Sequence, residues 1–159
     1  MTTTKRIIDV SASKVSFSIK KLGFLTIEGT IADFQGEVSF DENDLKNSFF
    51  NVSVSPVTID TGNPKRDEHL KSHDFFYAKE YPEISFRSAS IERENDHFLV
   101  IGELSLLNKT KSVRLPFTFQ NGTFEGQLSI NRLDYELGKK LPSFFVGKTV
   151  QVSIFGKMK

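Results

Sequence analysis

The sequence predicts an all-β fold in which about eight antiparallel strands form a barrel, with one short helix inserted between two of them. Three observations support this fold class. Apolar and polar residues alternate with a period of two along most of the chain. The alternating segments are joined mostly by connections of hairpin length. No segment has the features that blunt an exposed sheet edge, which favours closure into a barrel, although an open sandwich fits the same pattern.

Four alternating segments make up the first third of the chain. Gly29 lies inside the second, and a glycine in a strand predicts a bend or bulge of the kind that curls a barrel. Asp41 to Asp44 forms a polar turn, and a further strand passes through Val57 and Ile59. The positions expected to share a face are Val15, Phe17 and Ile19; Leu25, Ile27 and Ile31; Phe34, Gly36, Val38 and Phe40; and Phe50, Val52 and Val54.

The second half of the chain continues the alternation. Asn121-Gly122 predicts a hairpin turn, because both central residues of a type I′ turn need a positive φ. The expected faces are Ile84, Phe86 and Ser88; Phe98, Val100, Gly102, Leu104 and Leu106; Val113, Leu115, Phe117 and Phe119; Phe124, Gly126, Leu128 and Ile130; and Val150, Val152, Ile154 and Gly156. A barrel of eight strands is filled by its own side chains or holds one slender ligand, and periodicity does not separate these cases.

The segment from Thr58 to Phe76 departs from the strand pattern. Asp60-Thr61-Gly62-Asn63 has the composition of a turn, in which the Asp60 carboxylate is expected to accept hydrogen bonds from backbone amides. Asn63 followed by Pro64 is typical of a helix N-cap and first helical residue. The sequence therefore predicts a short helix from Pro64 to Lys71.

Length and composition restrict the function classes. The 159 residues suit a single domain, 1–159, and a net charge of +1 gives no argument for nucleic acid or an anionic membrane as partner. Without cysteine there is no disulfide, thiolate metal site or nucleophilic thiol. We expect a cytoplasmic protein, because no apolar run has the length of a signal peptide core or a membrane span. The 16 phenylalanines fill a β core or line a hydrocarbon slot.

Ionisable residues gather in the same unusual segment. Asp60, Asp67, His69, His73 and Asp74 would serve a metal-dependent or acid/base enzyme, with His69 and His73 at a spacing that suits a metal when both lie on a helix. His73 is expected past the helix end, however, and the alternative is that these are surface or capping residues. No nucleophile elbow, phosphate-binding glycine loop or dinucleotide fingerprint occurs.

Arg132 and Asp134 are two residues apart, which places them on one face of a strand. We expect them to form a charge pair that has a structural role, since a buried charge needs a partner.

Several ordered motifs resemble those of the YceI family of lipocalin-like polyisoprenoid-binding proteins. The matching residues run along the whole chain: Phe34-Gln35-Gly36, Phe40-Asp41, Asp60 to Asn63, Arg66-Asp67, His69 to Ser72, Asp74 to Phe76, Tyr81 to Phe86, Leu115 to Phe117, and Asn131-Arg132 to Gly138. The resemblance implies an eight-stranded antiparallel lipocalin-like barrel. It also implies an elongated apolar channel for an isoprenoid chain, and a homodimer.

For such a ligand the residues suggest two sets of contacts. A polyprenyl phosphate or an isoprenoid quinone needs polar groups at the channel mouth, and Arg66, His69 and Lys71 on the helix suit that role. The alternative is that these three side chains are solvated on an exposed helix face. The channel itself is predicted to be lined by Phe17, Ile19, Phe40, Phe75, Phe76, Phe86, Leu104, Phe117 and Leu128. Phe75 and Phe76 either close the mouth or pin the helix to the barrel.

The sequence therefore favours non-catalytic binding, sequestration or transport of an isoprenoid lipid, with no cofactor. The alternatives are the enzyme that uses the Asp60 to Asp74 cluster, and a filled barrel whose outer surface pairs with another protein.

Overall fold

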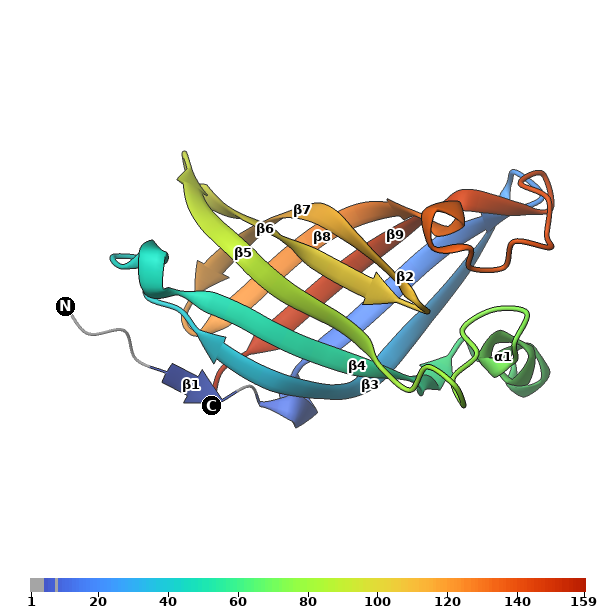
Figure 1. The fold of residues 1–159 in the computed structure, drawn as a ribbon, viewed down its shortest axis with the longest axis horizontal. Coiled ribbons are helices and arrows are strands. Elements are labelled where there is room, and N and C mark those ends of the chain that lie inside the picture. The colour runs from blue at the N-terminus through green and yellow to red at the C-terminus, as the bar shows by residue number, and fades with distance from the viewer. Residues whose placement is uncertain (1–4, 8) are drawn as a thin grey trace.

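Eight antiparallel strands form a closed barrel in the computed structural model, which describes residues 5–7 and 9–159. The strands follow the order β3-β2-β9-β8-β7-β6-β5-β4, and pairing of β3 with β4 completes the ring (Figure 1). They are β2 (Lys14–Lys21), β3 (Leu25–Ser39), β4 (Phe49–Asp60), β5 (Ile84–Glu94), β6 (His97–Leu106), β7 (Lys109–Gln120), β8 (Thr123–Asn131) and β9 (Val146–Lys157). The predicted fold class is confirmed.

A short strand that the sequence pattern did not predict extends the sheet. β1 (Lys5–Ile7) pairs with the last three residues of β3, and the 3-10 helix η1 (Val10–Ala12) separates it from β2. A strand of three residues is too short to show a period of two, so its sequence carries no signal.

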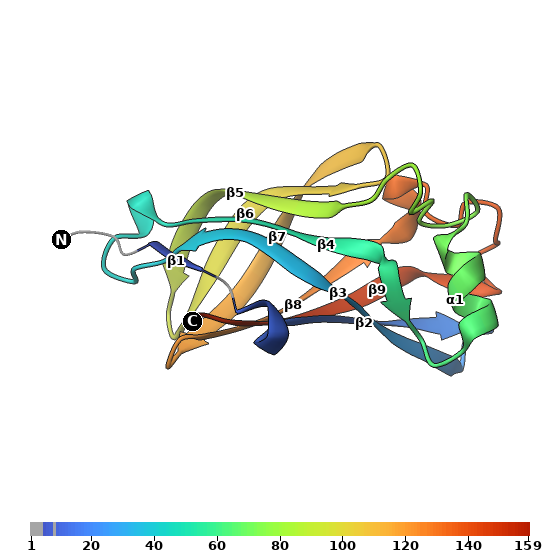
Figure 2. The same ribbon diagram turned by 90° about the horizontal axis from the view of Figure 1, so that it is seen from below.

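The two ends of the barrel differ in what connects the strands. One end, here called the helix end, carries helix α1 (Pro64–Lys71), the β2–β3 turn, and the connection that follows the 3-10 helix η3 (Arg132–Tyr135) (Figures 1 and 2). The other end, the hairpin end, carries the 3-10 helix η2 (Leu45–Asn47) and two tight hairpin turns. All the irregular segments long enough to shape an opening therefore lie at the helix end, apart from η2.

Two pairs of alternating segments turn out to be continuous strands with bulges. In β3 the alternation of inward-facing and outward-facing residues shifts by one between Ile31 and Phe34, where Asp33 has a φ of 62°. In β4 it slips near Ser55, whose hydroxyl donates a hydrogen bond of 2.7 Å to the Asp33 carboxylate. The two irregularities face each other, so the strands stay paired while the barrel bends.

The predicted helix is confirmed at both ends. Asn63 is the N-cap, and its side-chain oxygen accepts a hydrogen bond of 3.1 Å from the Arg66 amide. Pro64 occupies the first turn, where its missing N–H has no partner to lose. The helix ends at Lys71, so His73 lies beyond it as expected. Within the described residues, no helix has the length and apolar content needed to cross a bilayer.

Aromatic rings fill the hairpin end of the barrel. Phe40, which directly follows β3, is in the centre of this cluster and meets five other rings at centroid distances of 4.8 to 6.1 Å. Most of these contacts are edge-to-face, the favourable geometry for aromatic pairs. The rings around Phe40 are Phe50, Phe98, Phe117, Phe119 and Phe124. The hairpin end is therefore a packed core.

The bulge predicted at Gly29 is not there. The β2–β3 register passes through the Phe17–Gly29 pair without a shift, and the register shifts of β3 lie on its other edge, against β4. Gly29 instead makes room for a ring, because a Cβ on it would lie 2.6 Å from the tip of Phe17. The glycine therefore makes room for the Phe17 ring, and the register shift against β4 begins at the next residue, Thr30.

Gly36 closes the β3–β4 seam and should tolerate no side chain. Its φ is 129°, and a Cβ there would overlap the backbone of Asn51 on β4. We expect Gly36→Ala to lower the free energy of unfolding by about 3 kcal/mol, from backbone strain plus the overlap. Urea unfolding followed by far-UV circular dichroism measures this.

Gly122→Ala is the matched control. Gly122 also has a positive φ, 75°, but a Cβ there meets nothing within 4 Å. We expect the free energy of unfolding to fall by only about 1 kcal/mol. Equal losses in the two variants would show that the β3–β4 overlap carries no cost.

Candidate functional site

The barrel encloses a cavity of about 1030 Å³. Inward-facing side chains of β2 to β9 line it, together with residues of α1 and of the connection between η3 and β9. Almost all of the strand residues in the lining are aliphatic or aromatic. The hypothesis of a filled barrel is therefore wrong, because the interior side chains do not meet along the whole axis.

The depth of burial along the inward faces shows where the hollow lies. Toward the hairpin end the inward residues are fully buried, as in Val38 and Val100, with 1% and 0% of their surface exposed. Nearer the helix end, inward residues such as Ile19, Phe86 and Leu128 are only partly buried although they point into the barrel. Their remaining exposure faces the cavity, which therefore opens at the helix end.

Most of the residues predicted to line a channel do line this cavity. They are Phe17, Ile19, Phe75, Phe76, Phe86, Leu104, Phe117 and Leu128. Phe40 does not: the rings of the hairpin end surround it, and it closes the bottom of the barrel. The alternation correctly predicts the face but not the level along the barrel axis. Whether any of these side chains contacts a ligand stays a prediction.

The mouth of the cavity is basic. Lys21, Lys65, Arg66 and Arg132 are its charged lining residues, and among the residues that the structure describes no Asp or Glu lines it. Two of the five Arg66 N–H donors bind Thr61, at 2.8 Å each, and the rest have no partner within the described chain. The charged side chains that line the mouth are therefore all positive, and the nearest carboxylate, that of Asp74, is already engaged by His69 and Lys140.

Of the three predicted head-group residues, Arg66 and His69 lie on the cavity lining and Lys71 does not. The Lys71 ammonium points to the other side of the helix, where it pairs with Glu68 at 3.1 Å. Helix periodicity explains this difference, because residues five apart lie on different faces while those three apart lie close together.

The Asp60 to Asp74 cluster is divided among separate structural contacts. Asp60 accepts a hydrogen bond of 2.9 Å from the Gly62 amide, as predicted, and the buried Asp67 accepts hydrogen bonds from the Thr61 amide and hydroxyl. Within the described residues, no group of three or more His, Asp or Glu side chains is arranged to hold a metal ion. Asp60 and Asp67 therefore serve separate turn contacts, whereas His69 and His73 lie 3.2 and 3.5 Å from the Asp74 carboxylate.

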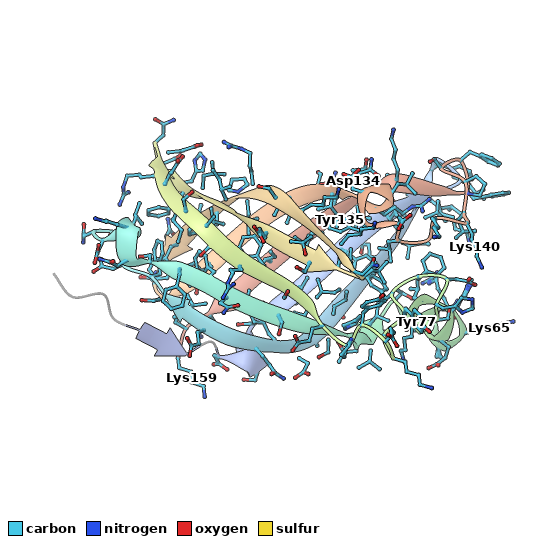
Figure 3. The ribbon with its side chains drawn as sticks, in the orientation of Figure 1. Lys65, Tyr77, Asp134, Tyr135, Lys140 and Lys159 are labelled. Carbon is cyan, nitrogen blue, oxygen red and sulfur yellow. The ribbon has the colours of Figure 1, made fainter. Side chains whose placement is uncertain are left out.

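Asp74 links the two segments that face each other across the mouth. One of its carboxylate oxygens lies 3.2 Å from the His69 ring nitrogen, and the other lies 3.2 Å from the Lys140 ammonium. The hydrogen bonds from His69 and Lys140 lower the pKa of Asp74 below its usual value. Figure 3 shows Lys140 on the connection opposite α1. The carboxylate is thus ionised at neutral pH and joins both sides of the opening.

Arg132 supports the connection that forms one side of the mouth. Its side chain is 1% exposed, and all five of its N–H donors bind backbone carbonyls at 2.7 to 3.0 Å. The acceptors are Gly147, Leu137, Gly138, Leu141 and Val146. Burial lowers the pKa of the guanidinium, which nevertheless stays protonated because its usual value is so high.

The predicted pairing of Arg132 with Asp134 is wrong, although the structural role is right. β8 ends at Asn131, whose side chain caps η3, so Arg132 and Asp134 do not follow a strand. On this 3-10 turn, labelled in Figure 3, Asp134 is exposed while the arginine turns inward. The carbonyls of the following residues replace the expected carboxylate.

Sequence reasoning missed several residues of the mouth. Lys21 and Lys65 line it although they were not singled out, and so do Leu141 and Phe145 from the connection after η3. The only signal was composition: a lysine-rich connection that also carries two adjacent phenylalanines. Barrel closure brings this connection beside the β2–β3 turn, a contact that no local pattern encodes.

Comparison with known proteins identifies the family of this chain. A model of the YceI-like domain matches residues 7–158. The protein YceI of Escherichia coli O157:H7 is 32% identical over 133 residues, which cover 77% of this chain and 70% of that protein. The UPF0312 protein of Photorhabdus laumondii is 37% identical over 101 residues, 64% of this chain but only 53% of that protein.

Solved structures share the fold. Burkholderia cenocepacia BcnA superposes with a TM-score of 0.88 at 28% identity, over 94% of this chain and 98% of BcnA. A polyisoprenoid-binding domain from Saccharophagus degradans, implicated in plant cell wall breakdown, has a TM-score of 0.69 at 14% identity, over 99% of this chain and 100% of that domain. The second likeness concerns the fold alone.

Proposed function

Because this chain belongs to the YceI-like family and its barrel encloses an apolar cavity with a basic mouth, we propose that it binds an isoprenoid lipid without transforming it. The tail lies in the cavity, and the polar head lies at the mouth beside Lys65, Arg66 and His69. The observation that carries this proposal is the combination of about 1030 Å³ of apolar interior with a rim whose charged lining residues are all basic in the described chain.

Burial of the tail supplies the affinity. Each buried methylene contributes about 0.8 kcal/mol, so an isoprene unit of five carbons contributes about 4 kcal/mol before the costs of ordering are subtracted. The cavity offers this environment along most of the barrel, up to the aromatic cluster that surrounds Phe40. Affinity should therefore rise with tail length until the tail fills the cavity.

The charge at the mouth favours a phosphate over a quinone as the head group. A phosphate would receive charge-assisted hydrogen bonds from Arg66 and Lys65, whereas a quinone carbonyl leaves the positive charge of the rim uncompensated. Arg132 adds a buried positive charge nearby, since carbonyls satisfy its donors without neutralising it. If the protein releases the bound lipid intact, its role is sequestration or transport of that lipid.

Lipid extraction from purified protein, followed by mass spectrometry, is the direct test. We expect a prenyl lipid in the extract, or saturable binding of added prenyl phosphates that tightens from a ten-carbon to a longer tail. A barrel that is empty as purified, and that binds none of the added prenyl compounds, would overturn the proposal.

Lys65→Ala tests the head group. Lys65 lies at the mouth, makes no ion pair with the described residues, and so can be removed without breaking a structural contact. We expect affinity for a prenyl phosphate to fall about fivefold to tenfold, while affinity for the prenyl alcohol stays the same. Lys79→Ala, at an exposed position outside the cavity lining, is the control. Equal losses for phosphate and alcohol would exclude a charged contact.

A further inference from the structure

Large apolar side chains are exposed beside the mouth, on two connections that touch each other. Phe24 in the β2–β3 turn is 74% exposed, and Phe144 in the connection before β9 is 69% exposed. The Leu22 amide donates a hydrogen bond of 2.9 Å to the Phe145 carbonyl, which joins the two connections. We call Leu22, Phe24, Leu25, Phe144 and Phe145 the apolar rim; all five are exposed.

The apolar rim is not part of the core, yet it is continuous with the cavity. Phe145 lines the cavity while its ring packs against Phe144 at a centroid distance of 4.4 Å. Of the other large apolar residues that are exposed in the described structure, Phe49, Val57 and Phe155 lie on β4 and β9, Tyr77 lies between α1 and β5, and Leu133 lies in η3. A cluster of this kind on a soluble surface marks a site of contact with another apolar phase or molecule.

The charges around the apolar rim have one sign. Residues 18–27 and 139–148, which carry the rim, contain five lysines and no Asp or Glu. Lys140 is paired with Asp74, and Lys139 lies at the 4.0 Å limit from Glu136, whereas Lys148 makes no ion pair with the described part of the chain. The rim therefore presents exposed rings among lysines with little local neutralisation.

We propose that the apolar rim docks on the surface of an anionic phospholipid bilayer. The rings would enter the headgroup region while the lysines meet lipid phosphates, the arrangement that holds amphipathic surfaces at a membrane interface. If two copies of the chain associated through this surface, the five lysines of one copy would face the same five lysines of the other. Their repulsion favours an anionic bilayer over self-association. This inference rests in part on the proposed function, since docking here would bring the cavity mouth to the membrane and spare the lipid tail a passage through water.

Co-sedimentation of the full chain with vesicles tests docking. We expect binding to vesicles of phosphatidylcholine mixed with phosphatidylglycerol, weakening as salt is added, and little binding to phosphatidylcholine alone. Phe24→Ser combined with Phe144→Ser should weaken vesicle binding at least about tenfold. Lys139→Gln combined with Lys148→Gln should weaken it about fivefold for each lysine.

The controls separate docking from ligand binding. Phe155→Ser removes an exposed ring on β9 away from the rim, and vesicle binding should not change. None of the four substituted residues, Phe24, Lys139, Phe144 and Lys148, lines the cavity, so farnesyl phosphate binding without vesicles should also stay unchanged.

Three outcomes would overturn docking. The first is a wild-type chain that binds farnesyl phosphate but no vesicles, and the second is vesicle binding that survives both double substitutions. The third is a dimer that the Phe24→Ser and Phe144→Ser substitutions dissociate, which would assign the rim to a second copy. Vesicle binding without any farnesyl phosphate binding would support docking and contradict the proposed function.

Discussion

Replacement of Leu128 by tryptophan should reduce the affinity for a long prenyl ligand at least about 100-fold. Leu128 on β8 packs against the core on one side and lines the cavity, where it is only partly buried. An indole there occupies space that the tail needs, so the ligand loses the burial of more than one isoprene unit, at about 4 kcal/mol each. Titration of a labelled prenyl phosphate measures the change.

The folded state should tolerate this substitution. The indole enters existing space and therefore displaces no side chain, so we expect the free energy of unfolding to change by less than about 1 kcal/mol. Because the chain has no tryptophan of its own, the introduced indole also reports on its surroundings by fluorescence. A blue-shifted emission would confirm that the ring lies inside the barrel.

Val57→Trp is the matched control. Val57 is 57% exposed on β4 and does not line the cavity, so the same ring is added outside the barrel. Ligand affinity should stay at the wild-type value. If Leu128→Trp binds the full-length ligand as well as Val57→Trp does, the cavity is not the binding site.

The inward face of each strand was predictable from sequence, and the hollow was not. Phe17 and Phe40 both follow the alternation, but Phe17 lies beside the cavity while Phe40 fills the hairpin end. Alternation gives the direction of a side chain relative to the sheet and contains no information about its level along the barrel axis. That level depends on strand tilt and stagger, which follow from closure of the whole sheet.

The local motifs of the mouth were predictable where their hydrogen bonds are local. Asp60, Asn63 and Pro64 form the expected turn and helix start because each interacts within three residues of itself along the chain. The apolar rim depends instead on contact between residues 22 and 145, far apart in sequence. Sequence shows such a contact only through composition, as lysines and phenylalanines in two separate connections.

Arg132 shows the same limit for electrostatics. A buried charge predicts a partner of opposite sign, which made Asp134 the expected one. The folded chain instead supplies five carbonyls from residues 137 to 147, three in the irregular connection after η3 and two at the start of β9. Carbonyl dipoles satisfy each N–H donor but do not neutralise the positive charge of the guanidinium. The arrangement therefore depends on the conformation of the connection and not on any acidic residue.

Arg132→Ala should therefore lower the free energy of unfolding by about 4 to 5 kcal/mol. It removes five hydrogen bonds and leaves their buried carbonyl acceptors without these donors, while relief of the buried charge offsets part of the loss. Arg114→Ala, at an exposed position on β7, should change stability by less than about 0.5 kcal/mol. Urea unfolding followed by circular dichroism compares the two.

Arg132→Lys separates the charge from the hydrogen bonds. The ammonium keeps the positive charge but has three donors at one point, so it reaches only some of the five carbonyls that the guanidinium spans. We expect the free energy of unfolding to fall by about half as much as in the alanine variant. Amide hydrogen exchange in residues 137 to 147 should also become faster. Full stability in the lysine variant would mean that charge alone holds the connection. In that case the mouth would be supported electrostatically and not by the carbonyl contacts of Arg132.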